Sequence, residues 1–236
     1  MELKKTYFNF LYNPIYDFTT ARLSFYQRLQ EACIGKLEFN AGDKVLCVGV
    51  GTGNEINRIL DKNAGVQICG VDFSNQALKR AYKKASKRGL EIIALRMDAQ
   101  KLDFADESFD KVVCIHVMGF ITDDKKATDE IIRVLRRDGQ FVITYPSGSG
   151  GLDLLSELMH SIRANFNSRK YGRALGELLA AVIGGIIYIP GAFFVKPGKG
   201  FYSTQDLKAM FDAKRLAAYQ LLEDHAYQDF IVYGKK

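Results

Sequence analysis

The stretch KVLCVGVGTGNEI, residues 44–56, decides the fold of this chain. Its first part, KVLCVGV (44–50), is a continuous apolar run that ends in glycines, as expected of a central strand buried on both faces. Gly49, Gly51 and Gly53 follow as a loop, and NEI opens a helical pattern. Glycines let the backbone turn tightly and let a ligand approach where any Cβ would clash. The stretch therefore predicts a strand, a ligand-binding loop and a helix in succession.

The chain beyond this stretch alternates short apolar runs with longer amphipathic stretches, which is typical of a parallel α/β sheet. Further strands are predicted at VQICGVDF (66–73), EIIALRMDA (91–99), DKVVCIHVMGF (110–120) and GQFVITYP (139–146). Helices are predicted at 75–88, with Ser74 or Asn75 as its cap, and at 123–137, where Ile131, Ile132, Val134 and Leu135 share one face.

The pattern changes after residue 146. SGSGG (147–151) is a flexible link, and a helical stretch and the uncharged segment 178–195 follow it. Alternation returns near residue 202: Ser203 or Thr204 caps a helix through Phe211, with Asp206 placed for a capping box, and the runs at 216–223 and 227–234 pair as an antiparallel edge. We therefore expect three parts: a helical cap at 1–40, an α/β domain at 41–146 and 201–236, and an insertion at 147–200.

The glycine loop and an acid together predict a nucleoside site. A dinucleotide-binding sequence reads GxGxxG, and here the third glycine comes one residue too early, which argues against NAD. Asp72 ends the second strand about 20 residues further on, where a carboxylate accepts hydrogen bonds from both hydroxyls of a ribose. The alternative is a glycine-rich turn with a capping acid.

Four segments, VLCVGVGTGNEI, VDFSNQAL, MDAQKLDFADESFDKVVCIHVMGFI and DEIIRVLRRDGQFVITYP, carry a resemblance over residues 44–146. In order and spacing they resemble the class I S-adenosylmethionine-dependent methyltransferases, most closely the branch with the ubiquinone and menaquinone methyltransferases. The resemblance implies a Rossmann-like, mostly parallel sheet with an antiparallel C-terminal edge, and S-adenosylmethionine as cofactor. It implies that Gly49, Gly51 and Gly53 pack against the methionine part of the cofactor, Asp72 holds its ribose, Phe73 lies against adenine, and Asp98 and Ala99 contact the adenine edge.

One position departs from this family. The family usually carries Asp or Glu two residues before the first glycine, where it helps to hold the amino group of the cofactor, and this chain has Cys47. A thiol does not replace a full carboxylate charge. The departure leaves open a protein that binds the cofactor without catalysis.

Methyl transfer from a sulfonium is an in-line displacement, so the protein mainly aligns the acceptor and excludes water. Ligands of open α/β sheets lie beyond the carboxyl ends of the strands, which makes His116 the first candidate for an acid, base or orienting role and Tyr145 the second. Each has an alternative as a packing residue. Met118 and Phe120 are expected to line the acceptor pocket, and Tyr12 and Tyr16 either contact the ligand from the N-terminal cap or pack on the surface.

The composition argues against a disordered chain and against a metal site. The 236 residues are 47% apolar and carry a net charge of +6, which excludes a disordered chain. The four cysteines have no metal-ligand spacing and no metal motif occurs, so no metal is expected and a reducing cytoplasm fits best.

The insertion favours an apolar acceptor such as a quinone precursor or lipid. Its segment 178–195 is 18 residues long without a charge, and Arg163, Arg169, Lys170 and Arg173 precede it. The segment either walls an apolar pocket or, with the basic cluster, attaches residues 160–199 to the inner face of a membrane. The competing function is an RNA methyltransferase, which the positive charge favours and the apolar insertion opposes.

Overall fold

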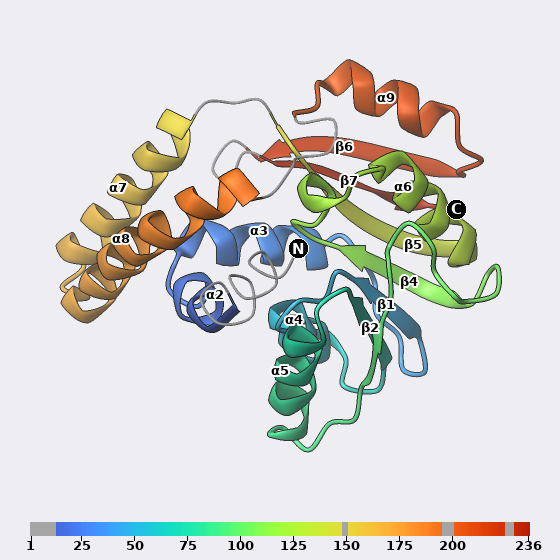
Figure 1. Ribbon diagram of the computed structural model, residues 1–236, viewed down its shortest axis with the longest axis horizontal. Helices are drawn as coiled ribbons and strands as arrows, with labels where there is room; N and C mark the ends of the chain where they lie inside the picture. Colours follow the sequence, from blue (N-terminus) through green and yellow to red (C-terminus); the bar gives the residue numbers. More distant parts are fainter. Residues whose placement is uncertain (1–12, 148–150, 195–200, 225–228) are drawn as a thin grey trace. The chain divides into compact units, whose positions relative to one another are not determined.

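A computed structural model describes residues 13–147, 151–194, 201–224 and 229–236 (Figure 1). The chain divides into two compact units. One unit contains residues 1–29, 149–196 and 224–228, and the other contains residues 30–148, 197–223 and 229–236. The N-terminal segment and the insertion, which the sequence analysis treats separately, thus share one unit.

The larger unit is built on a seven-stranded sheet of order β3-β2-β1-β4-β5-β7-β6. The strands are β1 (Lys44–Val48), β2 (Gln67–Asp72), β3 (Ile93–Arg96), β4 (Phe109–Cys114), β5 (Leu135–Pro146), β6 (Ala218–Asp224) and β7 (Asp229–Lys235). The pairs β3-β2, β2-β1, β1-β4 and β4-β5 are parallel, and β7 runs antiparallel to β5. The predicted parallel sheet with an antiparallel C-terminal edge is confirmed.

The helices of this unit are α4 (Asn54–Lys62), α5 (Asn75–Ser86), α6 (Asp124–Val134) and α9 (Thr204–Asp212), with a short 3-10 helix, η2, at Met118–Phe120. The caps predicted for α5 and α9 are confirmed. The Ser74 hydroxyl accepts a hydrogen bond from the Ala77 N–H, and Ser203 forms the predicted capping box with Asp206. Apolar residues of α6 and α9 pack with those of the strands in one core cluster.

Two predicted boundaries are wrong. The strand predicted at 110–120 ends at Cys114, because His116 takes a left-handed conformation with φ +59° and 118–120 turn into the 3-10 helix. The helix predicted to residue 137 ends at Val134, where the buried Leu135 begins β5.

The smaller unit contains α2 (Asn13–Thr20), the start of α3 (Ser24–Ile34), α7 (Gly151–Asn167) and α8 (Tyr171–Phe194). Helices α7 and α8 pack against each other side by side, and α2 packs against α8 (Figure 1). Within the described residues, no helix combines the length and the apolar character that crossing a membrane requires.

Candidate cofactor and acceptor site

The glycine loop is held by packing at its two ends and is open in the middle. Gly49, Gly51 and Gly53 all have positive φ, which glycine adopts without strain. A Cβ on Gly49 would lie 2.4 Å from the Val117 side chain, and one on Gly53 would lie 2.9 Å from the Cβ of Ala81. A Cβ on Gly51 would meet nothing closer than the Gly49 carbonyl oxygen at 3.8 Å. The loop therefore leaves room for a ligand at Gly51.

Asp72 ties the end of β2 to this loop. The Gly51 N–H donates to its Oδ2 at 2.9 Å, and the Ser74 N–H donates to its Oδ1 at 2.8 Å. Burial raises the pKa of Asp72, and the N–H groups of Ser74, Gly51 and Phe73 oppose that rise. Because a carboxylate has about four acceptor positions, these three bonds leave room for a ribose hydroxyl. The residues present fit a nucleoside at this edge.

The residues predicted around adenine follow the ends of neighbouring strands. β2 and β3 are parallel, with Asp72 opposite Arg96, so Phe73 and Asp98 lie beyond the same edge of the sheet. The Phe73 ring is 62% exposed, and the Asp98 carboxylate accepts from the Gln100 N–H. Ala99 packs partly against the core. An exposed ring offers a face on which a base stacks, and these assignments stay predictions.

Cys47 and Glu55 flank the glycine loop, and burial raises the pKa of both side chains. Cys47 is fully buried in β1, and burial raises the pKa of its thiol well above the ordinary value, so it carries no charge. Glu55 lies in the first turn of α4, and burial raises the pKa of its carboxyl to about 8. Sequence reasoning missed Glu55, although it is the first acid after the glycines.

His116 lies two residues beyond β4 and has a carboxylate beside its ring. Its N–H donates to the Thr144 hydroxyl at 2.7 Å, which fixes the left-handed turn. Its Nδ1 lies 3.4 Å from Oδ2 of Asp229, at the start of β7. The histidine side chain is 29% exposed, whereas that of Asp229 is 4% exposed. A buried acid thus faces one ring nitrogen of a partly exposed histidine. Sequence reasoning missed Asp229.

The other predicted residues divide by burial. Tyr145 is fully buried, and its hydroxyl bonds that of Thr128 at 2.7 Å, so its alternative as a packing residue fits the structure. Met118 is buried in the core cluster and offers a ligand no surface, whereas Phe120 is exposed and its ring meets that of His116 edge-on.

Two predicted contacts lie outside this unit. Tyr16 belongs to the smaller unit, where its hydroxyl bonds that of Tyr26. Tyr12 lies outside the described residues. Their contact with a ligand stays a prediction.

The topology, the open glycine loop and the carboxylate at the end of β2 define a Rossmann-like protein with a nucleoside site. Comparison with known proteins makes this more specific. A family profile described as "Methyltransferase domain" matches residues 46–143. Phosphatidylethanolamine N-methyltransferase of Cereibacter sphaeroides is 37% identical over 132 residues, 55% of this chain and 62% of that protein. Demethylmenaquinone methyltransferase of Thermus thermophilus is 28% identical over 89% of this chain and 91% of that protein.

A solved structure supports the fold independently. A putative S-adenosyl-L-methionine-dependent methyltransferase of Methanococcus maripaludis matches 99% of this chain and 93% of its own, with a TM-score of 0.63 at 19% identity. Residues 46–143 thus match a methyltransferase domain, and the chain is similar to S-adenosylmethionine-dependent methyltransferases, a similarity that implies S-adenosylmethionine as its cofactor.

Proposed function

We propose that the protein transfers a methyl group from S-adenosylmethionine to a small apolar acceptor. The observation that carries the proposal is the shared edge of β1, β2 and β4: the glycine loop meets Asp72 there, and the His116–Asp229 pair follows β4. The bound cofactor supplies an electrophilic methyl group on a sulfonium. The residues of this chain then align the acceptor and remove its proton.

His116 is the proposed base. Its Nδ1 faces Asp229, so an N–H on Nδ1 leaves the lone pair on Nε2. Nε2 accepts the proton of the acceptor as the bond from the acceptor atom to the methyl carbon forms. The buried Asp229 carboxylate stabilises the imidazolium that results, as a carboxylate does wherever it orients a histidine.

An apolar acceptor is supported by the surface of α8. Between residues 171 and 186, most large apolar side chains recur at helical spacing and are exposed, whereas the buried positions hold small residues and one acid. The exposed residues, which we call the apolar stripe, are Tyr171, Leu175, Leu178, Leu179, Val182 and Ile186, and the buried residues include Ala174, Glu177 and Ala180. An ordinary surface helix instead buries its large apolar side chains and exposes its charged ones. Extended apolar exposure of this kind marks an interaction surface.

We propose that an anionic lipid bilayer covers this stripe. Arg163, Arg169, Lys170 and Arg173 lie at the turn that joins α7 to α8, next to exposed Phe166 and Tyr171. Basic and aromatic residues beside an apolar stripe complement the headgroup region of such a bilayer. The names of the two relatives denote a phospholipid and a quinone as acceptors, and both are lipophilic.

Methyl transfer from labelled S-adenosylmethionine tests the function. The acceptors are phosphatidylethanolamine vesicles, a demethylated quinone in detergent and bulk RNA, and mass spectrometry identifies the product. We expect label on a lipophilic acceptor. Label on RNA overturns the apolar-acceptor proposal. Binding of S-adenosylhomocysteine without transfer to any acceptor supports the non-catalytic alternative instead.

A further inference from the structure

The methionine end of S-adenosylmethionine carries an ammonium group, and a cation removed from water requires an anionic partner. Cys47 occupies the position at which the family resemblance implies that partner, and its buried thiol is uncharged. Asp72 is already engaged with the N–H groups of Gly51 and Ser74 at the ribose side. The site therefore needs another acid.

The order of the strands indicates where an acid that binds the ammonium group must lie. With Asp72 holding the ribose, the nucleoside would lie at the end of β2, and the acceptor would lie near His116, beyond β4. β1 lies between these two strands, with Cys47 opposite Val113 of β4. Residues at the carboxyl ends of β1 and β4 would therefore hold the methionine end.

Glu55 lies at this place. Its charge raises the pKa of the Cys47 thiol in β1 and of the Cys114 thiol in β4, so its carboxyl lies close to both strands. It belongs to the first turn of α4, directly after the loop. The residue as a whole is partly exposed to solvent.

We propose that Glu55 holds the ammonium group of S-adenosylmethionine and has taken over, from α4, the acidic role that Cys47 in β1 does not fill. The inference rests on the proposed function, because it requires that the cofactor binds at the glycine loop.

The charged surroundings of Glu55 give the proposal a pH signature. Burial and, to a smaller extent, the charge of Asp72 in β2 raise the pKa of this carboxyl to about 8, and its own backbone N–H and Lys84 in α5 oppose the rise. Lys84 itself donates to Asn54 Oδ1 at 2.6 Å and to Thr52 at 3.3 Å. In the free protein at pH 7 the carboxyl is therefore mostly protonated. Binding a cation favours the ionised form, so cofactor binding releases a proton.

The variant Glu55→Gln tests the inference by calorimetry with S-adenosylhomocysteine, which carries the ammonium. The wild type should bind more tightly than this variant, and the ratio of the two affinities should grow by roughly tenfold between pH 6.5 and 8.5 as Glu55 ionises. At pH 7, titrations in phosphate and in Tris should show proton release by the wild type and much less by the variant.

A ligand without the methionine end gives the matched control. 5′-Methylthioadenosine has the same adenine and ribose, so Glu55→Gln should leave its affinity unchanged. Adding Cys47→Asp to Glu55→Gln should restore part of the lost affinity for S-adenosylhomocysteine, because the acid then returns to β1. The inference is overturned if Glu55→Gln binds S-adenosylhomocysteine as tightly as the wild type at pH 8.5, or if it weakens both ligands equally. Failure of the wild type to bind either ligand refutes the cofactor site itself.

Discussion

Asp72 is the residue on which the nucleoside site depends most directly. Asp72→Ala removes charge-assisted bonding to the ribose, worth about 1.5–3 kcal/mol for each bond, so affinity for S-adenosylhomocysteine should fall at least about tenfold. Calorimetry measures the change. Asp61→Ala, which removes an exposed partner of Arg88, is the control and should bind normally. Unchanged affinity in Asp72→Ala would show that the nucleoside binds elsewhere.

The site is only partly predictable from the sequence, for reasons of distance along the chain. The glycine loop and Asp72 lie about 20 residues apart in one strand, loop, helix and strand unit, so their meeting follows from local order. His116 and Asp229 are 113 residues apart. Their contact depends on β7 pairing antiparallel to β5, with Pro146 opposite Asp229, and a sequence pattern does not specify that register.

Substitutions of His116 and Asp229 should lower kcat without changing the affinity for the cofactor. His116→Gln should lower kcat by about 10²- to 10⁴-fold if the ring removes the proton of the acceptor, and Asp229→Asn should lower kcat less because the base remains. Affinity for S-adenosylhomocysteine should stay near the wild-type value in both variants. Full activity of His116→Gln would contradict the proposed base.

At the scale of elements, tertiary packing sets the boundary between α6 and β5, which the hydrophobic periodicity of the sequence placed wrongly. An apolar helical face through Leu135 reads equally well as the start of a strand. The structure resolves the choice because Phe109 of β4 pairs with Leu135 and buries it in the sheet. The caps at Ser74 and Ser203 were predictable because the residues that satisfy their hydrogen bonds lie three positions away.

Glu177 in α8 predicts how the helices of the smaller unit hold together. Its carboxylate is 1% exposed and accepts from the Ser24 N–H at 3.1 Å, the Ser161 hydroxyl at 2.8 Å and the Asn165 amide at 3.2 Å. Glu177→Ala removes the acceptor that these donors of α3 and α7 share, and Ser161 among them is buried, so we expect a cost of about 2–4 kcal/mol. Hydrogen exchange of α7 and α8 should accelerate accordingly.

The neighbouring ion pair provides the control for this prediction. Glu157 and Arg28 join α7 to α3 at 2.8 Å, and both side chains are well exposed. Glu157→Ala should change the free energy of local unfolding by less than about 1 kcal/mol, because exposed pairs contribute little. Equal exchange rates in Glu177→Ala and Glu157→Ala would refute a structural role for the buried network.

For the molecule as a whole, the net charge of +6 and the apolar stripe of α8 would both favour the proposed partner, an anionic bilayer. Charge attracts the protein to an anionic surface over a Debye length of about 10 Å at 0.1 M salt, and apolar contact acts once the surface is reached. Composition predicted the attraction but not the stripe. The stripe emerged only because the structure buries the small residues and Glu177 of α8 and leaves its large side chains outside.

Paired substitutions in the apolar stripe test whether the smaller unit binds vesicles while the larger unit binds the cofactor. Leu175 and Ile186 are 67% and 66% exposed, so Leu175→Glu with Ile186→Glu should leave the fold intact while removing apolar contact and adding negative charge. Binding to anionic vesicles should fall by at least about tenfold, since each large apolar side chain is worth about 1.5–3 kcal/mol when fully buried. Cosedimentation measures it. Affinity for S-adenosylhomocysteine should not change, because the glycine loop belongs to the other unit.

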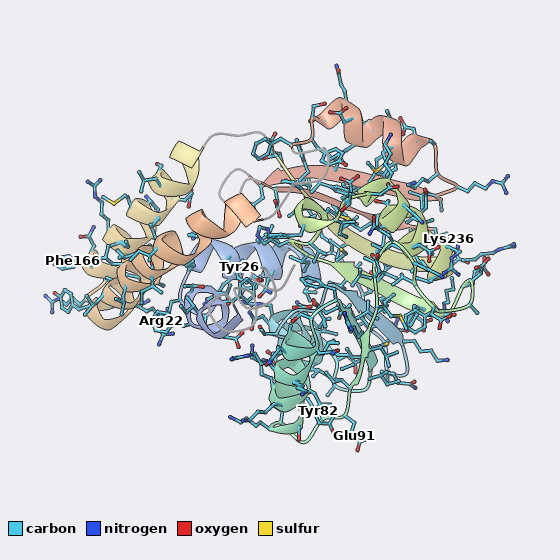
Figure 2. All side chains as sticks on the ribbon, viewed as in Figure 1. Arg22, Tyr26, Tyr82, Glu91, Phe166 and Lys236 are labelled. Atoms are coloured by element: carbon cyan, nitrogen blue, oxygen red, sulfur yellow. The ribbon has the colours of Figure 1, made fainter. Side chains whose placement is uncertain are left out.

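Two controls make the vesicle result specific. Tyr82→Glu places a charge at an exposed aromatic residue of α5, labelled in Figure 2, and should bind vesicles as the wild type does. Arg169→Gln with Lys170→Gln should weaken binding to anionic vesicles and leave the weaker binding to neutral vesicles unchanged, because only the charge is lost.

If the Leu175 and Ile186 double variant keeps vesicle binding but loses transfer to a detergent-dispersed acceptor, the stripe walls the acceptor pocket. If it keeps both, the stripe serves neither role and the proposal of an apolar acceptor loses its structural support.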